Sequence, residues 1–209
     1  MRLGSVKLTE SELNSIDPAF ATTRAGYKKR ATIIFTNGKT HKLWAGGSPT
    51  DMGITYPFLQ AVNEEKRFCV GMCLVDLYAH VARVGSETFR DRGRAKRNGL
   101  RPDSLRHAVL ITTVHELFHI QQAWMIGKNF GRDFVEEAIS SENRWEDYAE
   151  VNPAMGNAYL QNMFEAGAFD FTSRWWETNA EAINKGRFDF LLPMATMRGI
   201  FPELSNAYP

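Results

Sequence analysis

The chain has 209 residues, of which 44% are hydrophobic and 23% are charged, and its formal net charge is +1. This composition is typical of a single globular domain. The nearly neutral charge gives no reason to expect binding to nucleic acid or to an anionic membrane. No segment reaches the ~20 apolar residues of a membrane-spanning helix, and the N-terminus lacks the apolar core of a secretory signal. We therefore expect a cytoplasmic protein, with association with a virus particle or export by a specialised secretion system left open.

The first fifty residues predict a short helix followed by a hairpin. Thr9 and Glu12 form a capping-box pattern, so a helix should begin there and end before Asp17-Pro18. Two β-rich runs flank Asn37-Gly38, the dipeptide that best fits a type I′ turn. The sequence therefore predicts a β-hairpin over about 31–45.

The next segments are expected to be mainly helical. Residues 56–65 and 68–84 have helical patterns, although 68–78 could also be a buried strand. The only cysteines, Cys69 and Cys73, lie in the second of these segments, and we interpret them as small buried hydrophobic residues.

Residues 85–103 form a polar connection punctuated by glycines. It carries six basic residues, which are Arg90, Arg92, Arg94, Lys96, Arg97 and Arg101. A solvated loop is the simplest interpretation, and a contact with an acidic protein partner through 90–101 or a cover over a functional site are the alternatives.

The second half of the chain is expected to be helical. Asp103 or Ser104 can cap a long helix that ends at Gly127, and further helices are predicted over 132–150, 154–167 and 171–185. We therefore predict an α+β, mainly helical fold in one domain, 1–209. Its β-containing part is 1–103, with the polar loop 85–103, and its helical, metal-binding part is 104–209.

The stretch TTVHELFHIQQ, residues 112–122, contains the strongest candidate for chemistry. On a helix, His115 and His119 lie one turn apart and can bind the same ion. A catalytic zinc site uses three protein ligands and keeps one position for water. Glu116 is placed to accept a proton from that water. The pattern therefore predicts a Zn²⁺ site with Glu116 as the general base.

The third ligand is expected to be a carboxylate, because none of the five histidines follows the motif. In RWWETNAEAIN, Glu177 can bind the metal and Glu181 can orient a ligand histidine through its second ring nitrogen. In RWEDYAEVN, Glu146 and Glu150 have the same spacing, so Glu146 is the alternative third ligand. We favour Glu177.

The combination of HELFH with the later helix containing Trp175, Trp176, Glu177 and Ala180 resembles the gluzincin branch of the zinc metallopeptidases. The resemblance covers about residues 110–185. It implies a zincin-like fold, with His115, His119 and Glu177 as zinc ligands and Glu116 as the residue that activates water. Glu181 stands where many gluzincins carry an aspartate that supports the ligands.

The predicted function is hydrolysis of a peptide bond in a peptide or protein substrate. In zinc peptidases the substrate commonly adds as a strand to a sheet edge, which the hairpin at 31–45 could supply. One alternative is a structural or interaction protein of a larger assembly, whose metal site is architectural. The other is a zinc amidase that acts on a non-protein amide, because the motif does not distinguish one amide from another.

Overall fold

The computed structural model describes residues 2–17, 28–36, 52–56, 68–77, 79–80, 105–150, 161–188 and 191. It confirms the predicted α+β class, with a four-stranded mixed sheet in the N-terminal part and helices mainly in the C-terminal half. In chain order the elements are β1 (Arg2–Leu8), α1 (Glu10–Ile16), β2 (Lys28–Thr36), β3 (Gly53–Tyr56), β4 (Phe68–Asp76), α6 (Leu105–Phe130), α7 (Arg132–Glu150) and α9 (Met163–Asn184).

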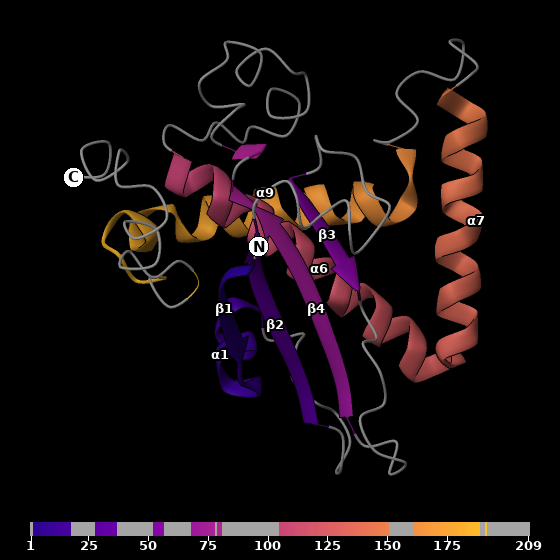
Figure 1. Cartoon of the computed structure of the whole chain (residues 1–209), viewed down its shortest axis with the longest axis horizontal. Helices are drawn as coiled ribbons and strands as arrows, with labels where there is room; N and C mark the ends of the chain where they lie inside the picture. Colours follow the sequence, from indigo (N-terminus) through magenta and orange to yellow (C-terminus); the bar gives the residue numbers. More distant parts are fainter. Residues whose placement is uncertain are drawn as a thin grey trace.

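The strands are ordered β1-β2-β4-β3 across the sheet. The two central strands, β2 and β4, are parallel, and each outer strand is antiparallel to its neighbour. The long helix α6 packs against β2, β3 and β4, and α9 packs on α6 (Figure 1). The described part of the chain therefore has three layers, which are the sheet, α6 and α9.

The face of the sheet that α6 covers carries the larger part of the core. Ile33 and Phe35 of β2 and Cys73 and Val75 of β4 are at most 1% exposed and belong to one cluster with residues of α6. Gly71 of β4 brings the helix close, because a Cβ at this position would clash with the side chain of Ile120. The centre of α6 is thus packed directly on the sheet.

The first helix forms as the capping pattern predicts. The side chain of Thr9 accepts a hydrogen bond from the backbone of Glu12, and the side chain of Glu12 accepts one from the backbone N–H of Thr9. The helix ends at Ile16, where Asp17 has an extended backbone.

The helical prediction for 68–84 is wrong over residues 68–76, which form strand β4. The strand alternative, 68–78, is correct over 68–76, and Leu77 is already helical. As a central strand, β4 is buried on both faces, so its sequence is almost continuously apolar and lacks the alternation that identifies half-exposed strands.

Two helix boundaries also differ from the prediction. Helix α6 does not end at Gly127 but continues to Phe130, and the carbonyl of Gly127 accepts a hydrogen bond from the N–H of Gly131. The left-handed backbone that ends the helix lies at Gly131, with φ +89°. The break predicted between 167 and 171 is absent, because α9 runs without interruption from Met163 to Asn184, whereas residues 154–160 of the predicted helix 154–167 lie outside the described residues.

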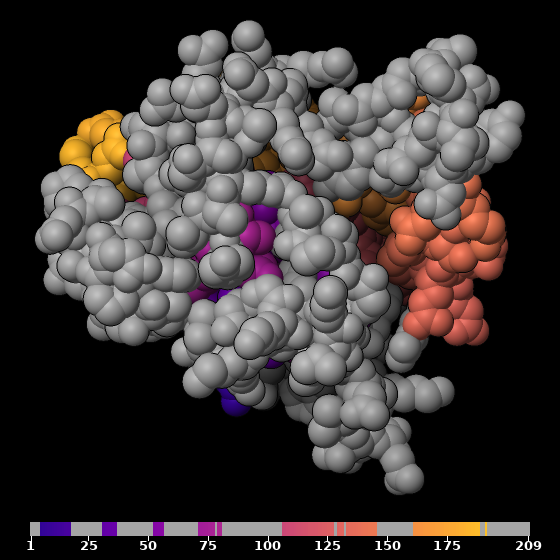
Figure 2. All heavy atoms as spheres, turned by 45° about the horizontal axis from the view of Figure 1, so that its top comes forward, coloured from indigo at the N-terminus to yellow at the C-terminus, as the bar shows by residue number. Residues whose placement is uncertain are grey.

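Helix α7 has the predicted bounds, 132–150, and is exposed along much of its described length. Its first part is at the surface in Figure 2, in salmon. None of the helices described in the structure is long and apolar enough to cross a membrane.

The hairpin prediction is tested only in its first strand. Residues 31–36 belong to β2, whereas 37–51 lie outside the described residues. The polar loop 85–103 also lies outside them, as does the helix expected at 56–65 except for Tyr56, which ends strand β3. The expectation that 31–45 supplies a sheet edge is wrong for 31–36, because β2 is flanked by β1 and β4. Among the strands that the structure describes, the edge strand that packs against α6 is β3.

Candidate metal site

The two motif histidines lie next to each other on α6. His115 and His119 are separated by one helical turn, and their Nε2 atoms are 3.2 Å apart. His115 is only 7% exposed, and its ring packs against Phe169 of α9 at a centroid distance of 4.6 Å. The helix therefore directs both imidazoles to one point between α6 and α9.

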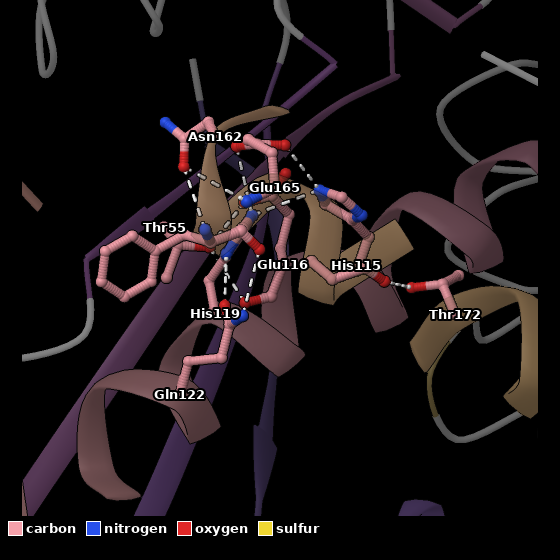
Figure 3. Close-up of polar contacts among 10 residues, drawn as sticks. Thr55, His115, Glu116, His119, Gln122, Asn162, Glu165 and Thr172 are labelled. Carbon is pink, nitrogen blue, oxygen red and sulfur yellow. Dashed lines mark hydrogen bonds and ion pairs between the residues drawn. The ribbon is translucent and has the colours of Figure 1, made fainter. Parts of the chain in front are cut away.

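The third side chain at this point is Glu165, from the first turn of α9. Its Oε2 lies 3.2 Å from Nε2 of His115, and its Oε1 lies 3.4 Å from Nε2 of His119 (Figure 3). Asn162 caps the helix, and its side-chain oxygen accepts hydrogen bonds from the backbone N–H groups of Phe164 and Glu165. The cap fixes the start of α9 and with it the position of Glu165.

The distances fit a small divalent cation. Ligand atoms about 2.0–2.2 Å from a tetrahedral zinc ion lie about 3.4 Å from one another. The separations here are 3.2 Å between the two histidine nitrogens, 3.2 Å between His115 and Oε2 of Glu165, and 3.4 Å between His119 and the other oxygen, Oε1. His115, His119 and Glu165 are thus a possible metal site, with a donor set of two imidazoles and one carboxylate.

The positive charge of His119 and the negative charge of Glu165 stabilise each other. Burial lowers the pKa of His119, but hydrogen bonding and attraction to Glu165, with a smaller contribution from Glu116, outweigh burial and raise it to about 9. Burial also raises the pKa of Glu165, but hydrogen bonds to His115 and His119 and their charges outweigh it, so the net shift is well below the ordinary value. Without a metal, Glu165 therefore supplies the negative charge that holds a proton on His119.

Glu116 lies beside this group, between α6 and the edge strand β3. It is 7% exposed, and its Oε2 is 2.5 Å from the hydroxyl oxygen of Thr55. Gly53 leaves the space that the carboxylate occupies, because a Cβ there would lie 2.5 Å from Oε1 of Glu116. Burial, and to a lesser extent the charge of Glu116, raises the pKa of Cys73 on β4. The charge of Glu116 is also a smaller contribution to the raised pKa of His119.

The carboxylates that the sequence singled out lie elsewhere or have undescribed side chains. Glu177 is an exposed residue of α9, twelve residues after Glu165. Glu181 is also exposed and pairs with Lys185 at 2.6 Å. Glu146 belongs to α7, but its side chain lies outside the described part of the structure. The possible metal site thus includes Glu165, which the sequence placed in a separate helix, 154–167, and which in the structure lies on the same helix as Glu177, α9.

Glu165 was missed although the sequence contains a signal for it. Glu165 and Ala168 repeat the E-x-x-A spacing that drew attention to Glu177 and Ala180. Four positions after Glu165 the sequence has Phe169, whereas four positions after Glu177 it has a second acid, Glu181. The pattern at Glu165 therefore lacks the acid expected to orient a ligand histidine. Asn162, three residues before Glu165, is in addition a good N-cap residue.

The remaining sequence candidates are the basic segment and the two cysteines. The basic segment 90–101 lies outside the described residues. Cys73 is a fully buried free thiol, as the sequence predicted, whereas the side chain of Cys69 is not described.

Comparisons with known proteins identify no relative, so any assignment of a function has to rest on the residues of this chain. No protein-family model matches the chain, and no curated protein and no solved structure matches it. The likeness to the gluzincins is therefore limited to the HExxH-type pattern of the group His115, His119 and Glu165.

Proposed function

We propose that the chain is a zinc-dependent hydrolase of amide bonds, and specifically a peptidase. The observation that carries this proposal is the convergence of His115, His119 and Glu165, whose candidate ligand atoms lie within 4.8 Å of one another, with a buried carboxylate, Glu116, beside them. Two histidines and one glutamate are a donor set of catalytic zinc sites.

Three ligands favour a catalytic site over an architectural one. A structural zinc site is closed by four protein ligands, whereas a catalytic site keeps one position for water. In the described part of the chain, the group contains three such residues. An architectural site would also have no use for Glu116, which is buried close enough to raise the pKa of His119.

The proposed reaction is the addition of water to an amide carbonyl, followed by cleavage of the C–N bond. A bound zinc ion lowers the pKa of a water molecule towards 7 and polarises the carbonyl group. Glu116 accepts a proton from the attacking water and delivers it to the leaving nitrogen. The products are a carboxylic acid and an amine, and Glu116 returns to its ionised form.

The edge strand β3 favours a peptide over a non-protein amide as the substrate. Among the described residues, β3 pairs with β4 alone, and its residue Thr55 contacts Glu116. An extended peptide that adds to this edge would lie next to the proposed base, held by main-chain hydrogen bonds. This is the role first expected of the hairpin at 31–45.

The test is hydrolysis by the zinc-loaded protein and its Glu116→Gln variant, with zinc content measured in both. We expect the variant to keep one zinc ion per chain and to lose hydrolysis by a factor of about 10²–10⁴. Glu177→Gln, which changes an exposed carboxylate, is the matched control and should retain both. Unchanged hydrolysis in Glu116→Gln would exclude Glu116 as the base.

Substrate class is tested with the same preparation. Peptide libraries and peptidoglycan-like amides should be compared at equal concentration. Cleavage confined to the second set would keep the zinc chemistry but replace the peptidase with an amidase. No cleavage of either set by a protein with a four-ligand site would favour the architectural alternative.

A further inference from the structure

The side-chain amide of Gln122 lies between the two helices that carry the metal-binding residues. Its Oε1 is 2.9 Å from Nδ1 of His119, which lies one turn before it on α6. Its Nε2 donates a 3.0 Å hydrogen bond to the main-chain carbonyl of Phe164 on α9. The amide thus connects the ring of one metal-binding residue to the backbone next to another, Glu165 (Figure 3).

The chemistry of the partners allows only one orientation of this amide. A main-chain carbonyl can only accept a hydrogen bond, so the NH₂ group of Gln122 must face Phe164. Its oxygen must then face His119, and an amide oxygen can only accept. It follows that Nδ1 of His119 carries the hydrogen in this contact.

The consequence for His119 is a defined direction of its free electron pair. When the neutral ring has its hydrogen on Nδ1, the lone pair for a metal is on Nε2. Nε2 is the atom that lies 3.2 Å from His115 and 3.4 Å from Glu165. Gln122 therefore selects the form of His119 that presents a ligand atom to the site.

Gly167 provides the space for the amide. A Cβ at this position of α9 would lie only 2.8 Å from Nε2 of Gln122. An alanine would increase the intrinsic helix propensity of α9, but it would push the amide away from the carbonyl of Phe164. The glycine is thus explained by the approach of Gln122.

We propose that Gln122 is a positioning residue, which holds His119 with Nε2 towards the metal and fixes the start of α9, including Glu165, against α6. This inference rests on the metal site of the proposed function. It gives Gln122 the supporting role that the sequence pattern had suggested for Glu181, which is exposed and paired with Lys185.

The test compares zinc affinity in the wild type with three variants. Gln122→Met keeps the length of the side chain but removes both hydrogen bonds, and Gly167→Ala displaces the amide. Gln121→Met is the matched control, because this neighbouring amide lies against the sulfur of Met125. We expect Gln122→Met and Gly167→Ala to bind zinc about 10–100-fold more weakly, as is typical for the loss of a residue that orients a ligand. The control should bind as the wild type does.

A second readout separates positioning from a general effect on folding. In zinc-loaded wild-type protein labelled with ¹⁵N, the ring of His119 should show a hydrogen on Nδ1 and zinc on Nε2, and the Nδ1–H signal should exchange slowly. In Gln122→Met this signal should exchange faster, while circular dichroism confirms that the protein is folded. Unchanged zinc affinity and unchanged exchange in folded Gln122→Met would overturn the proposal.

Failure of the proposed function can be told apart from failure of this inference. If the wild type binds zinc but cleaves no amide, the affinity and exchange measurements still test Gln122. If the wild type binds no zinc, the ring is observed in the metal-free protein at a pH at which the NMR spectrum shows it to be neutral. The Nδ1–H form should then predominate in the wild type and lose that preference in Gln122→Met, and a wild type in the Nε2–H form would contradict the proposal.

Discussion

The hydroxyl oxygen of Thr55 lies 2.5 Å from Oε2 of Glu116 and 3.0 Å from the main-chain carbonyl oxygen of the same residue. Thr55 belongs to the edge strand β3, and Glu116 belongs to the motif helix α6. A hydroxyl group has one hydrogen to donate, and the shorter contact is to the carboxylate. The edge of the sheet thus holds the side chain that we propose as the general base.

We expect Thr55→Val to reduce hydrolysis about 10-fold or more while zinc remains bound, because the valine keeps the shape of Thr55 but cannot donate to Glu116. Thr55→Ser keeps the hydroxyl and should retain most of the activity. The measurement is kcat for a cleaved peptide, with zinc content determined in parallel. Equal activity of the valine and serine variants would show that this hydrogen bond does not matter for Glu116.

Gly53→Ala should destabilise the protein. The new methyl group would lie 2.5 Å from Oε1 of Glu116, so either β3 or the carboxylate has to move. Insertion of a methyl group into a tightly packed site costs about 1–3 kcal/mol. Urea denaturation should show this loss, together with reduced hydrolysis. A variant with wild-type stability and activity would mean that the space beside Glu116 is larger than the structure indicates.

The stability of the metal-free protein should depend on pH through His119 and Glu165. The pKa of His119 is raised from 6.5 to about 9, so its contribution is complete below pH 6.5 and is lost as the pH rises through 9. The pKa of Glu165 is lowered from 4.5, so its contribution is present above pH 4.5 and is lost as the pH falls towards the lowered value. The free energy of unfolding should therefore decrease between pH 6.5 and 9.

This dependence is measured by urea denaturation of chelator-treated protein at several pH values. Glu165→Gln removes the carboxylate that holds the proton on His119, and this variant should show a weaker decrease over the same interval. A decrease as steep as that of the wild type would assign it to other groups.

The turn between α6 and α7 should depend on the glycine at position 131. Its φ of +89° is a conformation that residues with a side chain rarely adopt, although nothing lies within 4 Å of the Cβ position. Gly131→Ala should therefore cost roughly 1–2 kcal/mol through the backbone alone, and Gly131→Asn should cost less. Denaturant unfolding measures both. Zinc binding should be unchanged, because the substitution is remote in sequence from His115, His119 and Glu165.

The sequence was most informative where local interactions decide the structure. The reciprocal hydrogen bonds of Thr9 and Glu12 involve residues three apart, and the pairing of His115 with His119 follows from helical geometry alone. Both were predictable. The burial of β4 on two faces, in contrast, depends on its neighbours in the sheet, so its apolar pattern was equally consistent with a helix.

The third member of the possible metal site was harder to predict, because it depends on how α9 lies against α6. Glu165 and Glu177 are both in E-x-x-A patterns of one helix, but twelve residues separate them by about 18 Å along its axis and about 120° around it. Only one of the two can meet the histidines. The contacts that make the choice, from Gln122 to Phe164 and around Gly167, join residues more than forty positions apart.

The central claim is that His115, His119 and Glu165 bind one zinc ion. Its most direct test is the zinc content, by mass spectrometry, of metal-free protein that has been given one equivalent of zinc and then passed through a desalting column. The wild type and Glu177→Ala should retain about one zinc per chain, and Glu165→Ala should retain much less. Loss of zinc in Glu177→Ala with retention in Glu165→Ala, or no zinc in the wild type, would contradict the account.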